Sequence, residues 1–170
     1  MGMVERWGKL YLPHGSCILD KSDRGERLNE THIEFFAEGT PVARGSAKHM
    51  DWWMAVRNAA NKAAPKQPWA GSVEAAMLFV VPKPKGDPKK YLYPDRRPDL
   101  HMLVESVLDA ISRPNGNVVE DDSQICFKLT GKVYQDEKEE RRCGVRVRMY
   151  RIPPGHWSKL QKLGSSEVKS

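Results

Sequence analysis

Four ionisable side chains within residues 99–109 are spaced so that one helix would present them together. His101, Glu105 and Asp109 recur every four residues, which places them along one stripe of a helix, and Asp99 stands at its start. Carboxylates and imidazole are metal ligands, so this stripe is a candidate cation site. The alternative interpretation is that the stripe is only the solvated face of the helix and that Asp99 is only its N-cap.

A second acidic pair, Asp121-Asp122, follows the apolar pair Val118-Val119 after one intervening residue, as an acidic pair at the end of a strand would. If that strand packs beside the helix, the carboxylates of Asp99 and Asp122 converge on one hard cation. Mg²⁺ prefers oxygen ligands and usually keeps several waters, so two or three carboxylates suffice. The sequence therefore predicts a shared cation site at Asp99 and Asp122.

The charge distribution favours a nucleic-acid partner. The chain has 28 Lys and Arg against 22 Asp and Glu, a net charge of +6 and a pI near 9.3. Basic side chains gain affinity for nucleic acid by releasing the counterions condensed on its phosphates. The acidic groups lie between basic clusters, as a metal-dependent nuclease requires, because basic groups hold phosphates and carboxylates hold the cation. The basic clusters are Lys83/Lys85, Lys89/Lys90, Arg96/Arg97, Arg141/Arg142 and Arg146/Arg148/Arg151.

Hydrophobic periodicity indicates the elements that must position these groups. Apolar residues recur at helical spacing in residues 51–64 and in residues 99–111, where Asp99 occupies the cap position. Residues 82–98, rich in proline and basic side chains, are predicted to form a loop. The order of elements, strand–helix–strand–helix–strand–strand, indicates an α+β domain. Strands are predicted at residues 32–37, 72–81, 125–134 and 144–152, the last two as an antiparallel pair connected by the charged run 135–142.

The ends of the chain differ from this domain, which we place at residues 32–152. Residues 1–31 are predicted to be a variable leader with one short strand at 9–12, and residues 153–170 a polar tail. The mean hydropathy is −0.63, and no secretory signal or bilayer-spanning run is seen, so we expect a cytoplasmic protein. The three cysteines have no disulfide or zinc spacing and are expected to be reduced; they are Cys17, Cys126 and Cys143, with Cys126 expected in the core.

Two aromatic residues and three histidines have structural interpretations. Trp52 and Trp53 are expected to be packed, one in the core and one at a dimer or helix–sheet contact, with base stacking as the alternative. His32, His49 and His156 have no partners at ligand spacing and are expected to lie outside any site.

An ordered series of motifs runs through the second half of the chain. The run RPDLHMLVESVLDAI (residues 97–111) is followed by EDDSQI (120–125) and by KVY (132–134). This series resembles the signature of the RusA-like Holliday-junction resolvases: a basic or proline residue, D-x-D-N-L-x-K-x-x-x-D-x-L, a short turn, D-D-x-Q-[VI] and a K-x-Y strand. Upstream, GTPV (39–42) followed by Trp53 is similar to the family's opening strand and first helix. The resemblance spans roughly residues 32 to 152.

The resemblance implies a fold, a partner and a reaction. It implies a mixed β-sheet flanked by helices, a homodimer, and two divalent-metal sites, each cutting one of two symmetric strands of a four-way DNA junction. Asp99 takes the place of the family's first aspartate, Asp109 that of its helical aspartate, and Asp121 and Asp122 that of its acidic pair, with Asp122 the expected metal ligand. We therefore expect a Mg²⁺-dependent endodeoxyribonuclease that acts on branched DNA in recombination and repair.

The chain departs from the signature at three neighbouring positions. His101 stands where the family has its second catalytic aspartate, Met102 where it has asparagine, and Glu105 where it has lysine. Imidazole is a poorer ligand for Mg²⁺ than for Mn²⁺ or Zn²⁺, while Glu105 returns a carboxylate to the same helix face. Two hypotheses follow: a remodelled nuclease that prefers Mn²⁺, or a RusA-like protein that binds branched DNA without cutting it.

The nuclease hypothesis assigns a role to each candidate residue. Asp99, His101, Glu105 and Asp122 are assigned to catalysis, the first, second and last of them as metal ligands, and Asp109 and Asp121 to their support. Contacts to DNA are assigned to Lys83, Lys85, Lys89, Lys90, Arg96, Arg97 and Lys132.

Overall fold

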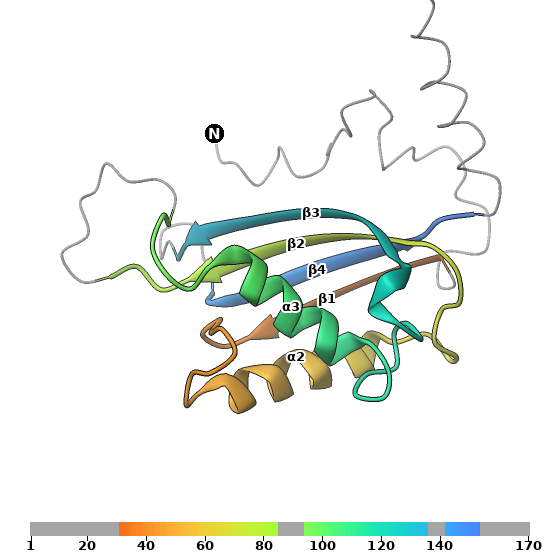
Figure 1. Ribbon diagram of the computed structural model, residues 1–170, viewed down its shortest axis with the longest axis horizontal. Helices are drawn as coiled ribbons and strands as arrows, with labels where there is room; N and C mark the ends of the chain where they lie inside the picture. Colours follow the sequence, from red (N-terminus) through yellow and green to blue (C-terminus); the bar gives the residue numbers. More distant parts are fainter. Residues whose placement is uncertain (1–30, 85–93, 136–141, 154–170) are drawn as a thin grey trace, which may run out of the picture.

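The computed structural model describes residues 31–84, 94–135 and 142–153 (Figure 1). The order of its elements is the predicted succession of strands and helices, and it confirms the α+β class. The predicted helix at 51–64 begins two residues earlier and ends one residue earlier in the structure. The elements are β1 (His32–Glu38), α2 (His49–Ala63), β2 (Val73–Val81), α3 (Leu100–Ile111), the short 3-10 helix η3 (Asp122–Gln124), β3 (Ile125–Tyr134) and β4 (Gly144–Arg151).

The four strands form one mixed sheet in the order β1-β4-β2-β3. Strand β4 runs antiparallel to both β1 and β2, whereas β2 and β3 are parallel. Parallel neighbours need a crossover connection, and α3 supplies it between β2 and β3. The prediction that residues 125–134 and 144–152 pair with each other is therefore wrong. Strand β2 lies between them, and its sequence, apolar except for Glu74, suits a central strand.

Helices α2 and α3 lie against the same face of the sheet (Figure 1). Alternate residues of the strands point to that face and are buried, such as Ile33 and Phe35 in β1 and Val145 and Val147 in β4. Helix α3 buries the apolar face that its sequence predicts. Leu103, Val107 and Ile111 of that face are completely buried. In the described part of the chain, neither helix has the length and apolar character needed to cross a bilayer.

The turn after α3 depends on a close approach of two backbone segments. A Cβ atom at Gly116 would lie 2.4 Å from the carbonyl oxygen of Ala110, so only glycine fits. The backbone N–H of Gly116 donates to the carbonyl oxygen of Ser112 at 2.7 Å. This tight return brings the buried residues Val118 and Val119 back against the core, and the acidic turn follows directly.

The aromatic predictions are confirmed in part, and the cysteine prediction is wrong. Trp52 is 3% exposed, and Trp53 is half-buried against the core with the Arg57 guanidinium 5.5 Å from its ring centroid. Cys126 is exposed rather than buried. Pairing with β2 passes from Ile125 directly to Phe127, so Cys126 is the extra residue of a bulge on the edge strand β3 and points outward. The strand predicted at residues 9–12, the tail, Cys17 and His156 lie outside the described residues.

Candidate functional site

Asp99 occupies the position immediately before α3, as its sequence predicts, but its side chain does not cap the helix. The residue has the extended backbone typical of an N-cap, and its carbonyl oxygen accepts from Leu103 N–H at 3.2 Å. Its carboxylate makes no capping hydrogen bond and is exposed. An anionic group at this end of a helix is stabilised by the partial positive charge of the unsatisfied N–H groups. The carboxylate of Asp99 is therefore available to a ligand.

The polar stripe predicted on α3 is present in the structure. His101 and Glu105 are exposed, and Asp109 is half-buried on the same side of the helix. Asp109 forms an ion pair with Arg44 of the segment between β1 and α2. The stripe thus has two parts: His101 and Glu105 face solvent near the start of α3, whereas Asp109 holds that segment against the helix.

The acidic pair lies in the turn that opens β3, and its two carboxylates have different surroundings. Asp121 caps η3: its Oδ1 accepts from Ser123 N–H at 2.9 Å. Hydrogen bonds from the side chain and backbone of Ser123 lower the pKa of Asp121, because they favour the ionised carboxylate. Asp122, the next residue, is exposed, and within the described residues no ion pair or side-chain hydrogen bond engages its carboxylate. The first aspartate of the pair therefore has a structural role, whereas the carboxylate of the second has no partner in the part of the chain that the structure describes.

Gln124 completes this turn. Its Oε1 accepts from Asp121 N–H at 2.8 Å, and its Nε2 donates to the carbonyl oxygens of Trp69 and Gly71, each at 2.9 Å. The side chain therefore fastens the acidic turn to the segment before β2. On the sequence alone, Gln124 is matched only to the glutamine of the D-D-x-Q motif and is assigned no role, although Asp121-x-x-Gln124 is a recognisable capping-box pattern.

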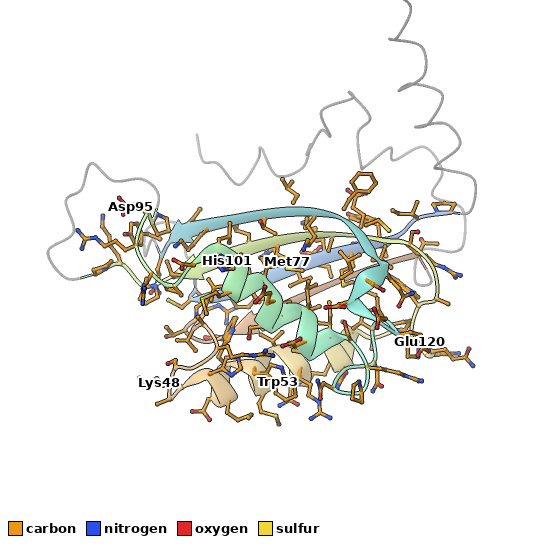
Figure 2. All side chains as sticks on the ribbon, in the orientation of Figure 1. Lys48, Trp53, Met77, Asp95, His101 and Glu120 are labelled. Atoms are coloured by element: carbon orange, nitrogen blue, oxygen red, sulfur yellow. The ribbon has the colours of Figure 1, made fainter. Side chains whose placement is uncertain are left out.

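Asp99 and Asp122 lie at opposite ends of β3. The turn before Asp99 contacts Lys132 near the end of the strand, whereas Asp122 comes just before its first residue, Ile125. Lys132 is seven residues beyond Ile125, which corresponds to roughly 23 Å of extended chain. In Figure 2, Asp95 lies toward one end of the domain and Glu120 toward the other, with His101 on the Asp95 side of Met77.

This separation corrects the expectation that Asp99 and Asp122 converge on one cation within a chain. Divalent ions in proteins bind carboxylate oxygens at about 2–2.6 Å, so carboxylates at opposite ends of the ten-residue strand β3 do not share one. Across the three described segments, no group of three or more His, Cys, Asp or Glu side chains could hold a metal ion. The described residues of a single chain therefore do not provide the set of ligands for the divalent ion that the sequence suggests.

The basic residues before α3 are described in part. Lys83, Arg96 and Arg97 are exposed, and the Lys83 ammonium lies 5.9 Å from the ring centroid of Tyr134. The lysines at 85, 89 and 90 lie outside the described residues. Arg96 and Arg97 are close in sequence to Asp99, so phosphate contacts there would bring a DNA backbone to that carboxylate.

Lys132 differs from these exposed basic residues. It is half-buried, and its Nζ donates to two backbone carbonyl oxygens, those of Arg96 at 2.7 Å and Pro98 at 2.8 Å. Its ammonium group is thus directed at the protein backbone in the turn before Asp99.

Comparison with known protein families agrees with this description. A family model described as Endodeoxyribonuclease RusA matches residues 34–150, which is more than half of the chain. The matched range contains α2, α3, η3, β2 and β3 entirely, together with most of β1 and β4. No match was found among curated proteins. The match confirms the resemblance that the motifs around Asp99 and Asp122 indicate.

Proposed function

Since this chain belongs to the RusA family of endodeoxyribonucleases, we propose that it cuts four-way DNA junctions as a homodimer that depends on a divalent cation. The family is one of endonucleases that resolve Holliday junctions. The observation that carries the proposal is the pair of exposed carboxylates, Asp99 and Asp122, which stand at the family's motif positions and are not engaged by other described residues.

The separation of these two carboxylates is the reason for proposing a dimer. Because Asp99 and Asp122 lie at opposite ends of β3, one chain cannot bring both to a single phosphate. In a symmetric dimer, every contact between the subunits occurs twice, once in each direction. Asp99 of each protomer can therefore lie beside the Asp122 carboxylate that the other protomer supplies. Two equivalent composite sites would then face two strands of one junction, which matches paired cutting. The cation, Mg²⁺ or Mn²⁺, is assigned to these composite sites.

His101 and Glu105 are proposed to act beside Asp99. Both are exposed on the first turns of α3, one helical turn apart, and so face the same solvent region. His101 supplies an imidazole nitrogen and Glu105 a further carboxylate, and both kinds of group can bind a divalent cation. Arg96 and Arg97, which Pro98 separates from Asp99, are assigned to the phosphates flanking the cut.

A second candidate function is junction binding without cleavage. The observation that favours it is the triple departure at His101, Met102 and Glu105, which removes an aspartate and a lysine from the family motif. The nearby Asp109 does not replace the lost aspartate, because it is held by Arg44. A protein of this kind would still bind branched DNA through its basic surface.

One experiment separates these functions. The full chain is incubated with a labelled four-way junction and, in parallel, a linear duplex of the same sequence, in Mg²⁺, in Mn²⁺ and with chelator. Cleavage of the junction alone, abolished by the chelator and by Asp122→Asn but unaffected by Glu120→Gln, supports the nuclease. Glu120 is a matched control because it lies two residues away, exposed and paired with Arg113 at 3.3 Å. Tight junction binding with no cutting in either metal would instead support the binding protein.

A further inference from the structure

Lys132 lies in β3, close to the turn that leads into α3. Its Nζ donates to the carbonyl oxygens of Arg96 at 2.7 Å and Pro98 at 2.8 Å, which belong to residues three and one positions before Asp99. An ammonium group has three donors and no acceptor, so these contacts use most of its hydrogen-bonding capacity. Lys132 is therefore oriented by the protein backbone rather than presented to solvent.

Leu100, the first residue of α3, packs against the core, but the position before it has no side-chain cap. Asp99 makes no capping hydrogen bond, so the usual side-chain restraint on an N-cap is missing. The direction of the Asp99 carboxylate then depends on the conformation of residues 96–98. Two charge-assisted hydrogen bonds from one rigid strand are a strong restraint on so short a segment.

We propose that Lys132 is a positioning residue that holds the turn at residues 96–98 and thereby aims the Asp99 carboxylate, and that it does not itself contact DNA phosphate. This inference rests on the proposed function, because it concerns the same site. It also accounts for a lysine at this point of the strand: the side chain is long enough to reach the turn, and its ammonium group satisfies two carbonyl oxygens at once.

The other end of β3 has an equivalent arrangement, which an independent set of contacts supports. Gln124 binds the backbone of Asp121 through its oxygen and the carbonyl oxygens of Trp69 and Gly71 through its nitrogen. These contacts need an acceptor and two donors in one planar group, which an amide has and a carboxylate lacks. Gln124 thus positions the turn that carries Asp122, as Lys132 positions the turn before Asp99.

The test for Lys132 compares Lys132→Met with Lys128→Met in the full-length chain. Lys128 is a matched control because it is an exposed lysine on the same face of β3, four residues earlier. Three quantities are measured: the single-turnover rate of junction cleavage, the junction Kd over a series of salt concentrations, and hydrogen exchange in the peptide covering residues 96–103.

If Lys132 positions Asp99, Lys132→Met lowers the cleavage rate at least about tenfold, because near-attack geometry is lost. Hydrogen exchange at residues 96–103 becomes faster, while the slope of log K against log salt is unchanged. If Lys132 instead binds a phosphate, that slope becomes shallower by about 0.9, with exchange as in the wild type. The second result would overturn the proposal. Lys128→Met is expected to leave the cleavage rate and the exchange unaltered.

A second variant covers the case in which Lys132→Met does not fold. Lys132→Gln removes the charge but keeps two donors, so a positioning role predicts partial recovery of cleavage and exchange protection relative to Met. The positioning role would be contradicted if Lys132→Gln and Lys132→Met reduced the salt slope equally and Lys132→Gln recovered no exchange protection.

The test for Gln124 uses Gln124→Glu, which keeps the shape of the side chain and removes both donors. Hydrogen exchange at residues 121–125 is expected to become faster, with an unchanged salt slope. Exchange at the wild-type rate there would refute the assignment.

The outcomes for Lys132 are distinguishable from failure of the proposed function. A wild type that cuts no junction in any metal would reject the nuclease. The salt slope and hydrogen exchange do not require cleavage, so they would still decide whether Lys132 contacts the backbone turn or DNA phosphate.

Discussion

His49 Nε2 lies 3.1 Å from Ser106 Oγ, and this hydrogen bond joins the first turn of α2 to the middle of α3. Ser106 is only 2% exposed, so its hydroxyl group is removed from water and depends on this partner. The sequence predicts that His49 lies outside any site, and its contact with Ser106 is a structural one. It contributes to holding α3, the helix that carries His101 and directly follows Asp99.

Ser106→Ala should therefore lower the free energy of unfolding by about 1 kcal/mol, because the ring nitrogen of His49 is left without its partner in a partly buried position. Urea denaturation followed by circular dichroism measures this change. Thr40→Ala serves as the control, since Thr40 is exposed in the loop between β1 and α2 and its side chain has no hydrogen bond to a described residue. If the two variants are equally stable, the His49–Ser106 contact does not contribute to helix packing.

His32 gives the stability of the fold a pH dependence. Burial of its ring lowers the pKa of His32 below the usual 6.5; Glu34 acts in the opposite direction, and Arg148 lowers the pKa further. Above pH 6.5 the ring is neutral in both states, and the fold bears no penalty. As the pH falls below 6.5, the unfolded chain binds the proton more readily than the folded chain, so the free energy of unfolding decreases toward the lower pKa of the folded state.

His32→Phe should remove this component, since phenylalanine retains a ring to stack on Tyr150, whose centroid lies 4.7 Å away, and has nothing to titrate. The measurement is the free energy of unfolding from pH 7.5 to pH 5 for both proteins. The chain has four other histidines, so the difference between the two curves, rather than either curve alone, reports His32. Parallel curves would show that His32 titrates normally in the folded protein.

The sequence predicted those parts of the molecule that local patterns determine. The apolar face of α3 and its stripe of His101 and Glu105 follow from helical spacing. The order of strands does not, because it depends on which distant segments pair, and β2 accordingly lies between two strands that looked like a hairpin. The bulge that exposes Cys126 arises from a register shift against β2 and leaves no mark in the apolar pattern around it.

The candidate site was predicted residue by residue but not in its geometry. Asp99 and Asp122 are both exposed, yet they lie at opposite ends of β3. The spacing of residues within each motif does not predict how far apart the two motifs lie in the fold. The contact between Arg44 and Asp109 joins residues 65 positions apart and could not be read from spacing. Gln124, in contrast, could have been found, because Asp121 and Gln124 have the spacing of a capping box.

The separation of Asp99 and Asp122 leads to a test by subunit mixing. Asp99→Asn and Asp122→Asn homodimers should each be inactive, because every composite site lacks one carboxylate. In a mixed dimer, one site combines both substitutions and the other has both native aspartates. Mixing the two inactive proteins should therefore restore nicking of one strand of the junction, without paired cutting.

Gel analysis of a junction labelled on each strand in turn distinguishes the outcomes. The control is a mixture of Asp99→Asn with the double variant Asp99→Asn/Asp122→Asn, which contains no intact composite site. If the first mixture is as inactive as the control after subunits have exchanged, each site is built within one chain, and the composite arrangement is wrong.

The final prediction concerns the metal and the residues that depart from the family motif. With His101 beside Asp99, Mn²⁺ should support more cleavage than Mg²⁺, since imidazole is a poor ligand for the harder ion. The double variant His101→Asp/Glu105→Lys restores the motif's aspartate and lysine and should shift the preference toward Mg²⁺. The measured quantity is the ratio of single-turnover rates in the two metals, which cancels a general loss of stability. A ratio that is identical in wild type and double variant would show that His101 does not reach the metal. Cleavage by the double variant alone, with none by the wild type in either ion, would mean that the native chain binds junctions without cutting them, because its remaining aspartates do not suffice.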